Sequence, residues 1–94
     1  MTANSNELPM PDFLTSDPKS RELVRIWLDK NENQVFLISR SGWDDPAAWG
    51  LLLVDLAKQI ARQYADTSSS FSEGAALERI RQGLDMEWRH PTGG

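Results

Sequence analysis

The chain has 94 residues, a formal net charge of -4, no cysteine and one histidine. Without cysteine it forms no disulfide, cysteine–zinc site or thiol nucleophile. The acidic balance repels phosphate backbones, so we expect no nucleic-acid partner. A chain of this length forms one domain at most and buries only about 60% of its unfolded surface, which favours oligomerisation as a further source of stability.

Residues 1–18 contain three of the five prolines and many small polar residues, which predicts a flexible N-terminal segment. This N-terminus lacks the basic and apolar regions of a signal peptide, and no apolar run in the chain approaches the roughly 18 residues of a membrane span. We therefore expect a cytoplasmic protein with no membrane partner. Phe13 belongs to an apolar group within the segment that either covers the core or docks on a partner.

Residues 22–28 (ELVRIWL) and 34–39 (QVFLIS) are rich in β-branched and aromatic residues, which is typical of strands. Residues 29–33 (DKNEN) between them predict a turn, with two asparagines that tolerate left-handed backbone, so the strands form an antiparallel hairpin. Alternation places two sets of side chains on opposite faces: Val24, Ile26 and Leu28, and Leu23, Arg25 and Trp27. Both faces carry apolar groups, and one helix layer covers only one of them.

Residues 46–65 follow the three- and four-residue spacing of an amphipathic helix. Pro46 suits the first helical position, where its missing N–H costs nothing. Asp45 is then the N-cap: its carboxylate accepts from free N–H groups of the first turn, and its charge, with that of Asp44, suits the positive helix end. The predicted apolar face comprises Trp49, Leu52, Leu53, Leu56, Ile60 and Tyr64.

Residues 72–89 follow the same helical spacing. Ser72 predicts the N-cap, with Phe71 and Ala76 as a hydrophobic staple, and Ser70 is the alternative N-cap. The predicted apolar face comprises Leu77, Ile80, Leu84 and Trp88.

Gly83 weakens this second helix by roughly 1 kcal/mol relative to alanine, which suggests close packing at that position. Pro91 ends the helix. The sequence therefore predicts a single domain over residues 19–91, followed by a tail of residues 92–94.

Asp44, Asp45 and His90 are the candidates for polar chemistry. The two aspartates suggest a metal site or an acid/base pair, but hard cations need about six oxygens and no calcium-loop pattern is present. A helix cap explains both from local physics. His90 lies in the last helical turn, where a cation is favoured, and no serine has the spacing of a nucleophile turn. We predict no catalytic residue, metal ligand or cofactor.

The four tryptophans and Phe36 are the candidates for apolar contacts. Trp49 and Trp88 lie on helical apolar faces, so we expect them in the core. Trp27, on the second face of the hairpin, and Trp43, in the loop before the first long helix, fit a cover of the core and a partner contact equally well. Phe36 on the second strand and Phe13 complete the predicted interaction residues.

Three segments in chain order resemble a family of small bacterial domains of unknown function, family 5076: ELVRIWL, WDDPAAWGLLLVDLAKQIARQYA and ALERIRQGLDMEWRHPT. The similarity covers roughly residues 20–92, and WDDPAAWG and the ending LDMEW…PT are its most specific parts. The resemblance implies a compact α+β fold in a bacterial cytoplasm. It implies no activity, cofactor or catalytic residue.

The predicted fold class is α+β, a β-hairpin followed by two helices (ββαα) in two layers. An isolated hairpin is marginally stable and has open edges, so two chains that pair edge to edge or face to face would extend and stabilise the sheet. We therefore expect a non-catalytic homodimer that binds another protein. The alternative is a metal- or small-ligand-binding site near Trp43, Asp44 and Asp45, with or without enzymatic activity.

Overall fold

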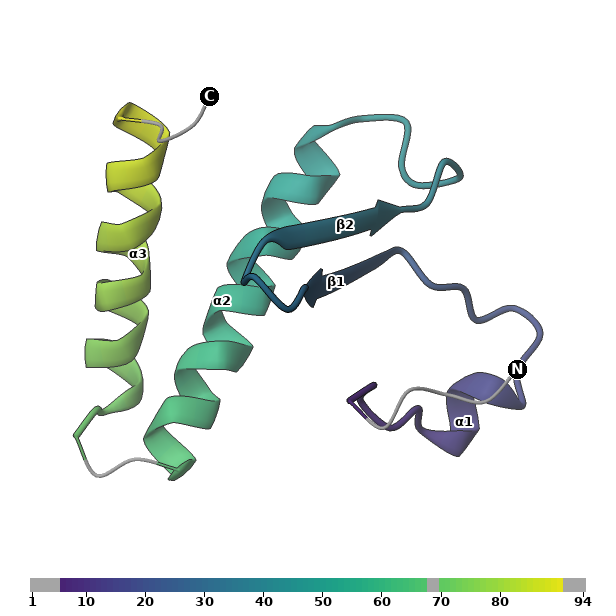
Figure 1. Ribbon diagram of the computed structural model, residues 1–94, viewed down its shortest axis with the longest axis horizontal. Coiled ribbons are helices and arrows are strands. Elements are labelled where there is room, and N and C mark those ends of the chain that lie inside the picture. Colours follow the sequence, from purple (N-terminus) through teal and green to yellow (C-terminus); the bar gives the residue numbers. More distant parts are fainter. Residues whose placement is uncertain (1–5, 68–69, 91–94) are drawn as a thin grey trace. The chain divides into compact units, whose positions relative to one another are not determined.

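The computed structural model describes residues 6–67 and 70–90. Its elements are α1 (Asp12–Thr15), β1 (Val24–Leu28), β2 (Gln34–Ile38), α2 (Ala47–Thr67) and α3 (Glu73–Arg89), as Figure 1 shows. The α+β class, a hairpin followed by two long helices, is confirmed, and the sheet is open.

The chain divides into two compact units, residues 1–42 and 43–94, and each is described by itself. The single domain over residues 19–91 and the two-layer packing of hairpin on helices therefore stay predictions. The predicted tail, residues 92–94, lies outside the described residues.

The hairpin of the first unit is antiparallel, with Val24 opposite Ile38, Ile26 opposite Phe36, and Trp27 opposite Val35 as its register. This pairing puts Ile26 and Phe36 on one face and Trp27 and Val35 on the other, because successive side chains of a strand alternate. The two-sided apolar pattern expected from the sequence is therefore present in the sheet.

Asp29 shapes the turn between β1 and β2. Its Oδ1 accepts hydrogen bonds from the backbone N–H groups of Asn31 at 2.8 Å and Asn33 at 2.9 Å. Both asparagines are thereby fixed by their backbone, and the residue with left-handed backbone is Glu32, at φ 64°. The predicted polar turn over residues 29–33 is therefore present, and its left-handed position is occupied by Glu32 and not by either asparagine.

The N-terminal segment contains one turn of helix, α1, where the sequence predicted no regular element. Ser16 closes the turn by donating its N–H to the carbonyl of Asp12 at 3.0 Å, and Thr15 Oγ1 donates to the same carbonyl at 3.0 Å. Residues 6–10 lie along β1 and line a hollow of about 680 Å³ with it. Residues 1–5 of the segment lie outside the described residues.

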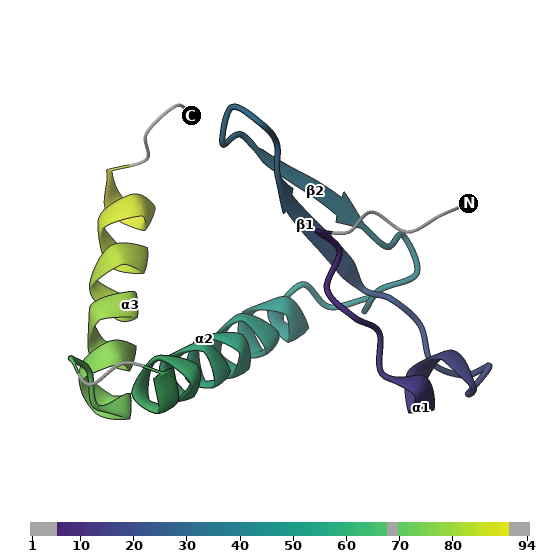
Figure 2. The ribbon, with the colours of Figure 1, turned by 60° about the horizontal axis from the view of Figure 1, so that its bottom comes forward.

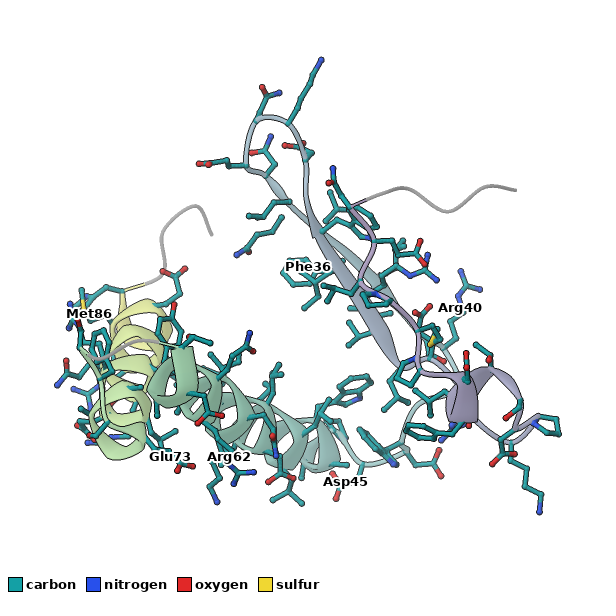
Figure 3. All side chains as sticks on the ribbon, turned by 90° about the horizontal axis from the view of Figure 1, so that it is seen from below. Phe36, Arg40, Asp45, Arg62, Glu73 and Met86 are labelled. Atoms are coloured by element: carbon teal, nitrogen blue, oxygen red, sulfur yellow. The ribbon has the colours of Figure 1, made fainter. Side chains whose placement is uncertain are left out.

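In the second unit, α2 and α3 approach most closely where α2 ends and α3 begins, and they diverge from there (Figures 1 and 2). The two side chains that are buried in the described chain mark this junction: Ala61 on α2 is 0% exposed and Ala76 on α3 is 4% exposed. Small side chains let the two helices come close. Arg62 Nε lies 3.5 Å from Glu73 Oε1 across the junction, and Figure 3 labels both.

The predicted apolar faces of the two long helices remain largely exposed. On α2, Leu53 is 53% and Leu56 45% exposed, because α3 meets α2 only near the end of α2, where Ala61 and Tyr64 lie. On α3, exposure rises away from the junction, to 48% at Leu84 and 81% at Trp88. The expectation of a core position is therefore wrong for Trp88 within the described chain, since α2 has diverged from α3 at that point.

Gly83 lies in the open part of α3, and a Cβ built there meets no atom within 4 Å. The close packing that the sequence suggested at Gly83 is therefore not present in the described chain. Among the described residues, no helix is both long and apolar enough to cross a membrane.

Candidate functional site

The loop before α2 carries the WDDP motif, and the structure explains its two ends by local contacts. The Trp43 ring meets the Trp49 ring edge to face, with centroids 5.2 Å apart and planes inclined by 71°. Asp45 Oδ1 accepts a hydrogen bond from the N–H of Ala47 at 3.0 Å, which is the predicted N-cap. Trp43 therefore folds back onto the first turn of α2 while 40% of its surface stays exposed.

The three polar candidates are exposed and do not form a cluster. Asp44 and Asp45 precede α2, whereas His90 follows α3 and donates its backbone N–H to the carbonyl of Met86 at 2.9 Å. Among residues 6–67 and 70–90, no three His, Asp or Glu side chains gather in a way that would hold a metal ion. Asp45 caps α2. Neither Asp44 nor Asp45 belongs to a group of three possible metal ligands among the described residues, and the same holds for His90.

An aromatic pair covers the junction of α2 and α3. The rings of Tyr64 and Phe71 meet edge to face at 6.0 Å, and the Ser72 hydroxyl caps α3 by accepting from the Ala75 N–H at 3.1 Å. Beside them lies a hollow of about 260 Å³, lined by Tyr64, Phe71, Ala76, Arg79 and Ile80. This is slightly below the roughly 300–1,000 Å³ of small-molecule sites. The pair of Tyr64 with Phe71 was not predicted, although the staple position of Phe71 signals it.

The hairpin of the first unit exposes large apolar side chains on both of its strands. Every residue of β2 is exposed, and Phe36, which Figure 3 labels, is 53% exposed. Its neighbour across the sheet, Ile26, is also 53% exposed. On the first face, the exposed apolar side chains are Ile26, Leu28, Phe36 and Ile38. Phe36 is thus the central residue of an uncovered apolar face.

The second face of the hairpin combines apolar and charged groups. Trp27 is half-buried and helps to line the hollow between β1 and residues 6–10, while Val35 and Leu37 are 42% and 54% exposed. Arg25 binds Glu22 with two hydrogen bonds, at 2.6 and 3.2 Å. The hydrogen bond to this carboxylate, followed by its charge, raises the pKa of Arg25 above its ordinary value.

Phe13 lies on α1 and is 71% exposed, so α1 leaves its ring uncovered. Of the predicted interaction residues, Trp27 and Phe36 lie on the two paired strands, but their side chains are on opposite faces of the sheet. Trp43 belongs to the second unit and is engaged by Trp49. Whether any of these four residues contacts a partner stays a prediction.

Comparison with known proteins matches this chain to a protein family and to solved structures. The model of the family described as Domain of unknown function (DUF5076) matches residues 7–92. A solved structure described as that of a putative pyruvate dehydrogenase, from the photosynthetic bacterium Rhodopseudomonas palustrus CGA009, is 32% identical with a TM-score of 0.75. That match covers 99% of this chain and 93% of the other. Among curated proteins, none matches.

Proposed function

The chain belongs to the family Domain of unknown function (DUF5076), and from this premise we propose that it is a non-catalytic protein-interaction module that works as a homodimer. The observation that carries the proposal is the hairpin: its first face is apolar and exposed at Ile26, Leu28, Phe36 and Ile38, and its second face also exposes Val35 and Leu37. A second copy of the chain would supply the apolar surface that covers these exposed side chains.

The long helices support the proposal independently. Within the second unit, the apolar side chains of α2 between Leu51 and Leu56 and those of α3 from Leu84 to Trp88 lie on the diverging parts of the helices. A large contiguous apolar patch on a protein surface usually marks a site of interaction with another molecule. A second copy supplies apolar surface of the same kind. Two-fold dimers are the commonest homo-oligomers, and oligomerisation is one way in which a small domain gains a larger core.

No enzymatic activity is included in the proposal. The pyruvate dehydrogenase description belongs to the solved structure from Rhodopseudomonas palustrus CGA009 and is itself marked as putative there. In this chain one histidine and no cysteine are present, and the described His, Asp and Glu side chains gather in no group of three. Exposed Asp44, Asp45 and His90 therefore give no observation that favours the alternative of a metal-binding or enzymatic site.

The test is the molar mass of the protein by light scattering after size exclusion, over a hundredfold dilution. We expect a stable species at twice the 10.6 kDa chain mass. Dissociation on dilution gives the dimer constant, because the monomer fraction depends on total concentration. A monomer at every concentration would contradict the proposal.

A variant pair reports whether the apolar surface is responsible. Trp88→Gln removes the most exposed tryptophan, whereas Arg89→Gln, one position further along α3, is the matched surface change. If α3 lies in the dimer contact, Trp88→Gln raises the dissociation constant and Arg89→Gln leaves it within twofold. Equal constants for both variants would remove α3 from the contact and restrict the proposal to the hairpin.

A further inference from the structure

The outer edge of β2 has free backbone groups at known positions. Ser39 donates its N–H to the carbonyl of Leu23, and Asp29 donates to the carbonyl of Asn33, both at 2.9 Å. These bonds mark the odd-numbered residues of β2 as those whose backbone groups face β1, because such pairs alternate along an antiparallel ladder. The even-numbered residues, Gln34, Phe36 and Ile38, therefore direct their N–H and carbonyl groups outward.

This edge lacks the features with which proteins protect open strands. The β2 sequence, QVFLI, contains no charge and no proline, and all five residues are exposed. A regular, uncharged edge of this kind is a template for pairing with another strand. The outer edge of β1 is different, because residues 6–10, with Pro9 among them, line a hollow with that strand, and Figure 2 shows this segment beside the hairpin.

We propose that the outer edge of β2 pairs with β2 of a second copy, antiparallel across a two-fold axis at Phe36, to form a four-stranded sheet. This inference rests on the proposed homodimer and specifies its contact. A sheet of four strands with an apolar face is independently stable where a two-stranded hairpin is not. The pairing also joins the exposed face of Phe36 and Ile38 to the same face of the partner.

Hydrogen bonding selects this register. With Phe36 opposite the partner's Phe36, Gln34 lies opposite the partner's Ile38, and Ile38 opposite the partner's Gln34. All three pairs then join outward-facing groups, and each pair exchanges two backbone hydrogen bonds. If one β2 strand is shifted by two residues relative to the other, one of these three pairs is lost. A shift of one residue sets outward groups against inward ones, and is excluded.

Charge complementarity supports the same register. Glu32 lies in the turn just before β2 and Arg40 just after its end, so the register centred on Phe36 brings the acidic end of each β2 strand near the basic end of the other. Neither residue forms an ion pair within the described chain. Opposite charges at the ends of a paired strand favour this partner over a strand of unrelated sequence.

The sharpest test uses single cysteines, because the natural chain has none. Directly opposite residues in a hydrogen-bonded antiparallel pair have Cα atoms about 5.5 Å apart, within the range that a disulfide spans. The matched controls are Val35→Cys and Leu37→Cys, each oxidised by itself. Under mild oxidation, we expect Phe36→Cys to form a covalent dimer at least about tenfold faster than either control. In those controls identical residues are diagonal neighbours about 7–8 Å apart.

The two control variants then test the register themselves. Mixed in equal amounts, Val35→Cys and Leu37→Cys form a disulfide with one another, because residue 35 lies opposite the partner's residue 37. Equal crosslinking of all three single variants, or fastest crosslinking of Val35→Cys with itself, would overturn the register. No crosslinking at any of the three positions in a protein that light scattering finds dimeric would overturn the β2 contact and leave the homodimer proposal standing.

A backbone variant gives a second readout. Phe36→Pro removes one outward N–H and keeps every bond of the hairpin, whereas Phe36→Ala removes the same ring and keeps the N–H. We expect Phe36→Pro to dissociate at least tenfold more readily than Phe36→Ala, with circular dichroism as the check on folding. Equal dissociation of two folded variants contradicts the contact; if Phe36→Pro does not fold, the cysteine rates decide. A monomeric wild type overturns both proposals together.

Discussion

The carboxylate of Asp45 accepts a hydrogen bond from the backbone N–H of Ala47 at 3.0 Å, and this contact begins α2. It satisfies one of the N–H groups that the first helical turn leaves without a partner. We expect Asp45→Ala to lower the free energy of unfolding by about 1 kcal/mol, as the loss of an N-cap does. Urea denaturation at one fixed protein concentration measures this change.

Asp44→Ala is the matched control, since Asp44 is the neighbouring carboxylate and, among the described residues, it is Asp45 that accepts the hydrogen bond from α2. Its removal deletes the same charge near the helix end and is expected to cost a few tenths of a kcal/mol. If both variants lose the same stability, charge rather than hydrogen bonding begins α2, and the cap assignment to Asp45 is wrong.

The local parts of the fold could be predicted from the sequence. Asp45 and Ser72 cap the helices that the apolar spacing predicted, and the polar residues 29–33 form the turn of the hairpin. Each of these depends on contacts within about five residues along the chain. Residue type alone therefore determines them.

The tertiary environment of the apolar faces could not be predicted in the same way. The α2 face with Leu53 and Leu56 has the spacing of a buried face, but α3 approaches α2 only near the end of that helix, at Ala61 and Tyr64. Small residues such as Ala61 permit the closest approach of two helices. An analysis of apolar periodicity gives alanine less weight than leucine and therefore does not identify such a contact. Trp88 is exposed for a related reason: helical spacing identifies which face is apolar but not what covers that face.

The open surroundings of Gly83 lead to a prediction about stability. Gly83→Ala is expected to raise the free energy of unfolding by about 1 kcal/mol, because alanine is the better helix former and its methyl group meets no atom. Gly50→Ala, at a second helical position with open surroundings, is the comparison. If Gly50→Ala stabilises and Gly83→Ala destabilises, another chain packs closely against α3 at Gly83, and the α3 surface is part of the dimer contact.

The pairing of Trp43 with Trp49 leads to a prediction about the loop before α2. Trp43→Ala is expected to lower stability by at least about 1 kcal/mol, since an edge-to-face pair contributes about 0.5–1.5 kcal/mol beyond the area it buries. Trp43→Phe retains part of the ring contact and is expected to lose less. Near-ultraviolet circular dichroism checks the contact directly, and an unchanged spectrum in Trp43→Ala would contradict it.

The exposed positions of Asp44, Asp45 and His90 lead to a prediction about metals. Mg²⁺, Ca²⁺, Mn²⁺ and Zn²⁺ are each expected to leave the melting temperature unchanged within error, because the described residues bring no three ligands together. Thermal unfolding with and without each ion measures this. A rise of several degrees that Asp44→Asn with Asp45→Asn abolishes would support the alternative metal site.

The carboxylate of Asp29 leads to a prediction about pH. Backbone N–H groups of Asn33 and Asn31 bind its charged form, so the pKa of Asp29 in the folded chain lies below the ordinary 3.8. A lowered pKa means that the folded hairpin prefers the charged carboxylate. The stabilisation is therefore complete above the unfolded pKa and is lost as the pH falls below 3.8 and through the folded pKa.

Asp29→Asn separates this contribution from the general effect of acid. The asparagine cannot lose a proton, so the stability difference between wild type and Asp29→Asn should be constant near neutral pH and shrink as the pH falls below 3.8. Carbon-13 NMR of the Asp29 carboxyl group measures the folded pKa directly. A value at or above 3.8, or a stability difference that does not change with pH, would show that the turn gains nothing from the charge and depends on Asp29 only as a neutral acceptor.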